Sequence, residues 1–173
     1  MKSGRQLHLV TSLVCAASAC THPTSPQAVS ATVAVRATSL EAVVTVVERV
    51  TWIQFDVPLR FENTGSTRIT FIPCASYLEA RSGTSWSHAW RPTCLVTGES
   101  QDDTVSPGEA REVTVRIAAA LDGPGGPSWE ADGIDGNLRY VAGFGYTGLD
   151  GTIPTVPSNE FVLTVAKWMV PAP

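Results

Sequence analysis

Between Ile53 and Glu62, five apolar side chains alternate strictly with four polar ones and a proline. Successive side chains of an extended chain point to opposite faces, so this pattern predicts a strand with one face buried and the other in solvent. Pro58 falls on the polar face and has no N–H to donate, which predicts a strand at a sheet edge or bulged at that point. No segment has convincing helical periodicity over three turns, so the sequence favours an all-β chain.

Turn residues divide the rest of the chain into further short stretches of strand character. Asn63-Thr64-Gly65-Ser66 and Ser106-Pro107-Gly108-Glu109 both have the composition of tight turns. Besides residues 53–62, we expect strands at 31–37, 41–51, 77–81, 85–90, 93–97, 112–117, 138–147 and 160–167, and one that begins at Ile69. Short strands separated by Gly/Pro turns are typical of a two-sheet β-sandwich, which we expect to hold seven to nine strands.

The first 19 residues have the pattern of a cleavable export signal. A basic start at Lys2 and Arg5 precedes an apolar run over residues 7–17. That run is too short to cross a bilayer, so it predicts a signal peptide and not a spanning helix.

The end of this signal resembles the lipobox of bacterial lipoproteins. The residues are Ala17-Ser18-Ala19-Cys20, with alanine at the position where leucine is usual. The resemblance implies that Cys20 carries acyl chains (palmitate and similar lipids) that anchor the exported protein to the bacterial cell membrane. In a Gram-negative cell, Thr21 in place of aspartate implies the outer membrane. Cleavage by ordinary signal peptidase, releasing a soluble protein that begins at Cys20, remains the alternative.

The residues after the signal divide into a tether and one domain. Residues 20–30 form the lipidated cysteine and a flexible, proline-bearing tether, and residues 31–170 form the domain. Signal cleavage leaves ten basic residues against 16 acidic ones, a net charge of −6. Phosphate binding needs clustered Lys and Arg, so the composition argues against a nucleic-acid partner.

The cysteines indicate one disulfide. Cys15 leaves with the signal and Cys20 takes the lipid, so Cys74 and Cys94 remain. In an exported protein two such cysteines are most simply paired, and the bond would stabilise the fold by roughly 3 kcal/mol. A metal site of Cys74, Cys94 and His88 is the alternative, but it lacks a fourth ligand at close spacing.

Four segments of the domain resemble immunoglobulin-like domains of bacterial exported proteins. They are residues 59–65, 69–71, 105–109 and 158–163. The same order of motifs is similar to the intracellular proteinase inhibitor family. The resemblance implies an immunoglobulin-like antiparallel β-sandwich. The inhibitory residues of that family cannot be matched to this sequence, so the resemblance extends to the fold and not to the activity.

The segment from Ser85 to Trp90 contains the best binding candidates. Strand alternation predicts that Trp86, His88 and Trp90 share one face. Exposed, Trp86 and Trp90 could contact a protein or glycan partner; buried, they would be core residues. His88 is the only histidine of the domain, and there is no Gly-x-Ser-x-Gly turn to supply a nucleophile, so we expect no catalytic histidine.

A glycine-rich loop at residues 121–137 carries Glu130, Asp132, Asp135 and Asn137. Oxygen ligands at such spacing can hold Ca²⁺, but the order does not match an EF-hand, and a solvated loop is the simpler interpretation. We therefore expect no metal and no cofactor. The sequence predicts a lipid-anchored, non-enzymatic binding or envelope-associated module. The alternative is a proteinase inhibitor that presents residues 121–137 or the Cys74–Cys94 loop.

Overall fold

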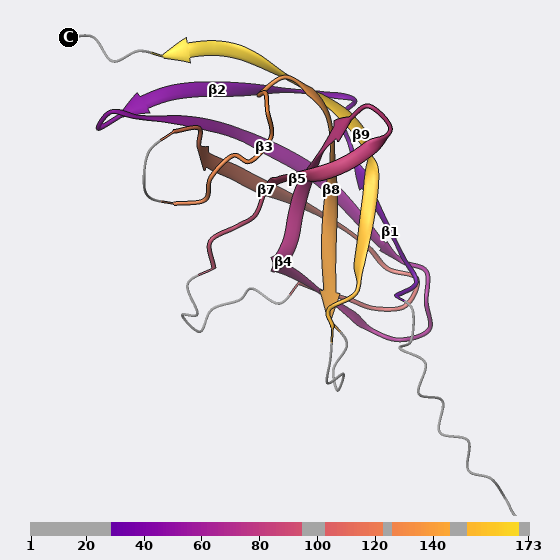
Figure 1. The fold of residues 1–173 in the computed structure, drawn as a ribbon. Helices are drawn as coiled ribbons and strands as arrows, with labels where there is room; N and C mark the ends of the chain where they lie inside the picture. The colour runs from indigo at the N-terminus through magenta and orange to yellow at the C-terminus, as the bar shows by residue number, and fades with distance from the viewer. Residues whose placement is uncertain (1–28, 95–102, 123–125, 146–151, 170–173) are drawn as a thin grey trace, which may run out of the picture.

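The computed structural model describes residues 29–94, 103–122, 126–145 and 152–169, which form nine strands and no helix (Figure 1). The all-β prediction is therefore confirmed, and none of the described residues belongs to a helix that could span a membrane. In chain order the strands are β1 (Ala31–Val35), β2 (Ser39–Val47), β3 (Val50–Asn63), β4 (Ile69–Ser82), β5 (Ser85–Trp90), β6 (Asp103–Val105), β7 (Ala110–Ala120), β8 (Gly136–Gly145) and β9 (Thr155–Met169).

β3 is the central strand of one layer. Its alternating apolar side chains are all buried: Ile53, Phe55, Val57, Leu59 and Phe61. β7 pairs with β3 along one side, while β2 and then β1 pair with the other side. The half-buried strand predicted from the sequence is confirmed, and its apolar face forms one wall of the core.

The second layer, built on β4 and β8, packs against that apolar face. Phe61 lies 4.4 Å from Phe71 of β4 and 5.5 Å from Phe144 of β8 between ring centroids, and Phe71 and Phe144 lie 6.1 Å apart. All three rings are almost completely buried. Each buried ring stabilises the fold by about 2–3 kcal/mol, so this aromatic contact joins the two layers of a β-sandwich.

β9 connects the two layers and departs from the predicted all-antiparallel pairing. Its first half pairs antiparallel with β8, and its second half pairs parallel with β2, from Ser39 opposite Val162 to Thr45 opposite Met169. Figure 1 shows β9 beside β8 at first and along β2 afterwards. The sheet is therefore mixed, because strand pairing depends on where the chain returns in space and not on the alternation pattern.

The strand expected over residues 41–51 is instead the start of a hairpin. β2 ends at Val47, β3 begins at Val50, and these two residues pair across a two-residue turn. Glu48 and Arg49 have φ of 50° and 71°. Two central residues with positive φ define the type I′ turn, which suits hairpin twist but favours Asn-Gly. A Glu-Arg pair carries no such signal, so the prediction missed the turn.

Pro58 does not mark a sheet edge, contrary to the prediction. It lies inside β3 and opposite Thr114 of β7. On its other side, β3 pairs with β2 only as far as Gln54 and with β1 only from Leu59, so Pro58 faces the gap between these two partner strands. Its carbonyl accepts the N–H of Arg36, 2.9 Å away. A gap in the pairing accommodates the missing N–H as an edge would.

Asn63 ends β3 with a buried side chain that organises the following turn. Its Nδ2 donates to the carbonyls of Thr67 (2.8 Å) and Val105 (3.0 Å), and its Oδ1 accepts the N–H of Gly65 at 3.0 Å. The side chain is 0% exposed. Three main-chain groups at this end of the sandwich, of which the bond to Val105 is buried, thus depend on one amide.

Replacing Asn63 by alanine should lower the free energy of unfolding by at least about 2 kcal/mol, because three main-chain groups lose their partner. Chemical denaturation of the purified protein measures the change. Asn137→Ala is the matched control, because Asn137 is exposed. Equal denaturation midpoints for the two variants would contradict the role assigned to Asn63.

Candidate functional site

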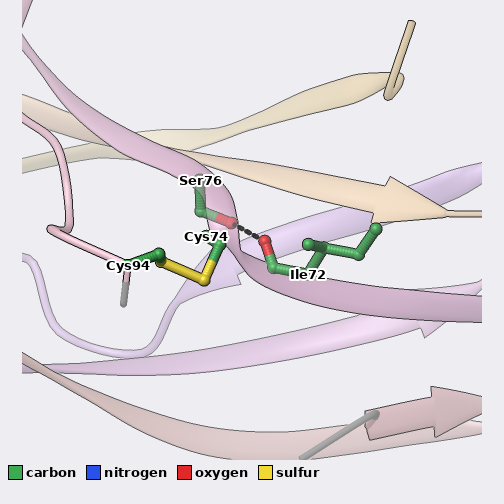
Figure 2. Close-up of a disulfide and its surroundings, with 4 residues drawn as sticks. All are labelled: Ile72, Cys74, Ser76 and Cys94. Atoms are coloured by element: carbon green, nitrogen blue, oxygen red, sulfur yellow. Dashed lines mark hydrogen bonds between the residues drawn. A yellow bond between two sulfur atoms is a disulfide. The ribbon is translucent and has the colours of Figure 1, made fainter. Parts of the chain in front are cut away.

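β4 contains a bulge that interrupts its pairing with β8. Ile72 is opposite Gly143 and Tyr77 is opposite Val141, so residues 73–76 of β4 face a single residue of β8. Ser76 fills the gap in the hydrogen bonding, because its Oγ donates to the Ile72 carbonyl at 2.9 Å (Figure 2). The same Oγ accepts the Gly143 N–H, also at 2.9 Å. A Cβ on Gly143 would lie 2.6 Å from that of Ala75, so only glycine fits here.

The bulge carries the disulfide. Cys74 is bonded to Cys94, with their Cα atoms 5.7 Å apart, and both residues are exposed (Figure 2). The pairing predicted from the sequence is confirmed. The bond ties the bulge of β4 to the segment that follows β5, where Thr93 and Cys94 are not in a strand; the rest of the strand expected at 93–97 lies outside the described residues.

A second bulge, at Ala89 of β5, separates the two tryptophans. Leu78 is opposite Trp90 and Glu79 is opposite His88, so one residue of β5 has no counterpart on β4. The predicted common face is therefore wrong. Trp90 turns into the core and is 4% exposed, whereas His88 and Trp86 stay on the outer face. A one-residue insertion reverses the faces of all positions beyond it.

Trp86 is held in place on the outer face by Arg139 of β8. The Arg139 guanidinium lies 4.3 Å from the centre of the indole ring and is also ion-paired to Glu79 at 2.6 Å. Glu79 and Arg139 are opposite each other in β4 and β8. The ion pair thus fixes the guanidinium on the ring face, and Trp86 is half-buried beneath it.

Tyr77, His88 and Arg91 continue this surface. The rings of Tyr77 and His88 meet edge to face at 4.6 Å, and Arg91 lies 5.5 Å above the Tyr77 ring. Arg91 Nη2 is 2.6 Å from His88 Nε2, so Nε2 accepts and the ring proton is assigned to Nδ1. We call Tyr77, Glu79, Trp86, His88, Arg91 and Arg139 the outer-face cluster.

His88 has the surroundings of a packed side chain. Its Nδ1 is buried and makes no hydrogen bond within the described part of the chain. A histidine of a Ser/His/Asp arrangement has a carboxylate on this nitrogen and a hydroxyl on the other, and here arginine occupies the second position.

Trp90 lines a groove on the opposite side of β5. The groove has a volume of about 280 Å³, and its mainly apolar wall includes Pro73, Trp90, Pro92, Val115, Pro127 and Tyr140. The indole Nε1 of Trp90 donates to the Ala118 carbonyl of β7 at 3.1 Å. The second tryptophan thus has both a structural role and a place in a surface groove.

The loop that carries Glu130, Asp132, Asp135 and Asn137 is held by hydrogen bonds from its side chains to main-chain groups. Trp129 is buried and donates its Nε1 to the Gly133 carbonyl, 2.9 Å away, and Asp135 accepts the N–H of Val165 at 2.8 Å. Within the described ranges, no three His, Cys, Asp or Glu side chains lie close enough together to hold a metal ion. The loop is thus an ordered surface segment for residues 126–137.

Sequence reasoning missed the partners of the outer-face cluster. Arg139 and Tyr77 stand on polar-face positions of predicted strands, but only the pairing of β4 with both β5 and β8 brings them to Trp86 and His88. Cys20, the signal and all but two residues of the tether lie outside the described residues.

No family model and no curated protein matches the chain. Among solved structures it is similar to the ASH/PapD-like domain of human CEP192 (PapD-like domain 7), at 12% sequence identity and a TM-score of 0.36. That match covers 92% of this chain and 98% of the other.

The phenol of Tyr140, which lines the groove, should lose its proton at a higher pH than an ordinary tyrosine. Burial raises its pKa from 10.0 to about 12, outweighing a hydrogen bond with Ser76 that lowers the pKa. The folded state thus favours the neutral phenol, so this contribution to stability is present below pH 10 and is lost as the pH rises toward 12. In a spectrophotometric titration one of the three tyrosines should ionise late, and Tyr140→Phe should remove that step. A late step that survives in the variant would contradict this assignment.

Proposed function

We propose that this chain is an exported binding module without enzymatic activity, anchored by a lipid on Cys20 to the bacterial cell envelope. Its partner is a protein or a glycan bound by the outer-face cluster. The observation that carries the proposal is the Trp86 ring beneath Arg139, because both planar groups are already fixed before any partner arrives.

Fixed planar groups favour binding for a physical reason. Immobilising a flexible side chain at an interface costs about 0.5–1.5 kcal/mol in lost conformational freedom. Arg139 and Glu79 already restrict Trp86 before binding, so less freedom is lost when a partner binds. Aromatic and arginine side chains also supply much of the binding energy of protein interfaces.

The surroundings of His88 support a non-enzymatic role. Its Nε2 accepts from Arg91, and its buried Nδ1 has no hydrogen-bond partner among the described residues, so neither nitrogen contacts a carboxylate or hydroxyl as in a catalytic triad. The exposed disulfide supports export, since such bonds persist in oxidising compartments.

The anchor is tested first. Protein expressed from the full sequence in a bacterial host should partition with membranes and have the mass of residues 20–173 plus acyl chains, because Cys20 accepts the lipid. Cys20→Ala should lose both the added mass and the membrane partitioning, as read by intact-mass spectrometry and fractionation. A soluble, unmodified wild-type protein that begins at Cys20 would overturn the anchor and leave the binding proposal standing.

The binding surface is tested with Trp86→Ala and Arg139→Ala. Each variant should weaken binding to a partner found on a glycan array or by cross-linking in envelope extracts at least tenfold, because each removes one of the two stacked planes. Val47→Ala is the matched control, since Val47 is exposed on the distant β2–β3 hairpin.

A proteinase inhibitor is the second candidate function. It is favoured by the ordering of residues 126–137 through Trp129, since a rigid exposed loop is what such an inhibitor presents. Inhibition of a protease panel that is unaffected by Trp86→Ala would support this candidate and contradict the cluster as the binding surface.

A further inference from the structure

One edge of β7 has no main-chain partner among the described residues over half its length. β7 lies on the side of β3 away from β2 (Figure 1), and it pairs with β3 continuously from Ala110 to Ala120. Among the described residues, no named strand pairs with its other edge. An edge of this kind presents free main-chain donors and acceptors to another strand.

The hydrogen bonds at the end of β7 show which residues face the open edge. The Ala118 carbonyl accepts from the Trp90 indole, the Ala120 N–H donates to Pro127, and the Ala120 carbonyl accepts from Trp129. Leu121, by contrast, donates back to Thr51 of β3. Even-numbered residues of β7 therefore direct their main-chain groups away from β3.

Strand alternation extends this direction to Glu112, Thr114 and Arg116, because β7 and β3 pair without a bulge. Trp90 and residues 127–129 cover the edge only at Ala118 and Ala120. No main-chain partner for Glu112, Thr114 or Arg116 on this edge occurs in the part of the chain that the structure describes.

The side chains on this stretch form a self-complementary pattern. Glu112 and Arg116 flank Thr114 at equal spacing, and their side chains are 63% and 77% exposed. If two copies of β7 pair antiparallel about Thr114, Glu112 of each copy lies opposite Arg116 of the other. Opposite charges in directly opposed positions stabilise a strand pair, whereas an edge with one sign of charge would repel its copy.

We infer that the open edge of β7 pairs with β7 of a second copy, antiparallel about Thr114, to form a two-fold symmetric dimer. The interface is isologous, so each contact occurs twice, as closed dimers require. Thr114 lies at its centre, opposite Thr114 of the second copy, and contributes both its N–H and its carbonyl.

The neighbouring strand extends the charge pattern across such a dimer. Arg116 is opposite Asp56 in β3 and bonded to it at 3.0 Å, and Glu112 is opposite Arg60. A row across the joined sheets therefore reads Asp56 and Arg116 of one copy, then Glu112 and Arg60 of the other. The signs alternate along this row of four residues, and Glu112 is also ion-paired to Arg36 of its own copy, so it would lie between two arginines in the dimer.

Reversing the charge of Glu112 or of Arg116 tests the dimer, and mixing the two variants should restore it. The full chain carrying Cys20→Ala, so that no lipid contributes, should be a dimer by sedimentation at micromolar concentrations. Glu112→Arg and Arg116→Glu should each raise the dimer dissociation constant at least tenfold, because two like-charged contacts arise in each variant dimer. Mixing the two variants should restore a dimer that contains one of each chain, detected by native mass spectrometry.

A charge reversal on the other layer serves as the control, and an uncharged substitution at Thr114 tests the edge itself. Glu160→Arg should leave the dimer unchanged, since Glu160 pairs with Arg81 on the other layer. Thr114→Pro tests the edge without changing charge, because the lost N–H points away from β3 and Thr114 faces Pro58 there. Circular dichroism confirms that the variants are folded. A monomeric parent protein, or a mixture of the two charge variants that stays monomeric, would overturn the inference.

Discussion

The burial of the apolar face of β3 against Phe71 and Phe144 is the contact on which the rest of the structure depends. β3 pairs with β1, β2 and β7, so the position of one whole layer follows from it. Phe61 touches both facing rings and thereby sets where β4 and β8 pack against β3. β9 then closes the sandwich by pairing with both layers.

Two bulges in the second layer decide which side chains of β4 and β5 reach the surface. The four-residue bulge at residues 73–76 brings Cys74 to the surface while Ser76 satisfies the interrupted main chain. The single-residue bulge at Ala89 sends Trp90 inward and leaves Trp86 outside. Bulges re-aim side chains in this way and are common in strands beside functional sites.

The outer-face cluster and the open edge of β7 belong to different layers. Pairing of two β7 edges joins the layers built on β3 and leaves the outer face of β4 and β5 uncovered. A dimer formed in this way would carry two copies of the cluster. Two linked sites raise the effective affinity for a repetitive target such as an envelope surface, without any new contact.

The sequence by itself determined the all-β class, the apolar face of β3, the strand at 85–90 and the pairing of Cys74 with Cys94, because periodicity and cysteine number are local or countable properties. The Glu48-Arg49 turn, the gap at Pro58 and the parallel pairing of β9 with β2 were decided only by tertiary structure. The same holds for the candidate site, since the bulge at Ala89 arises from the register of β5 on β4 and not from its residues. Strand alternation states which side chains share a face only while the register is regular, and register is set by packing between distant segments.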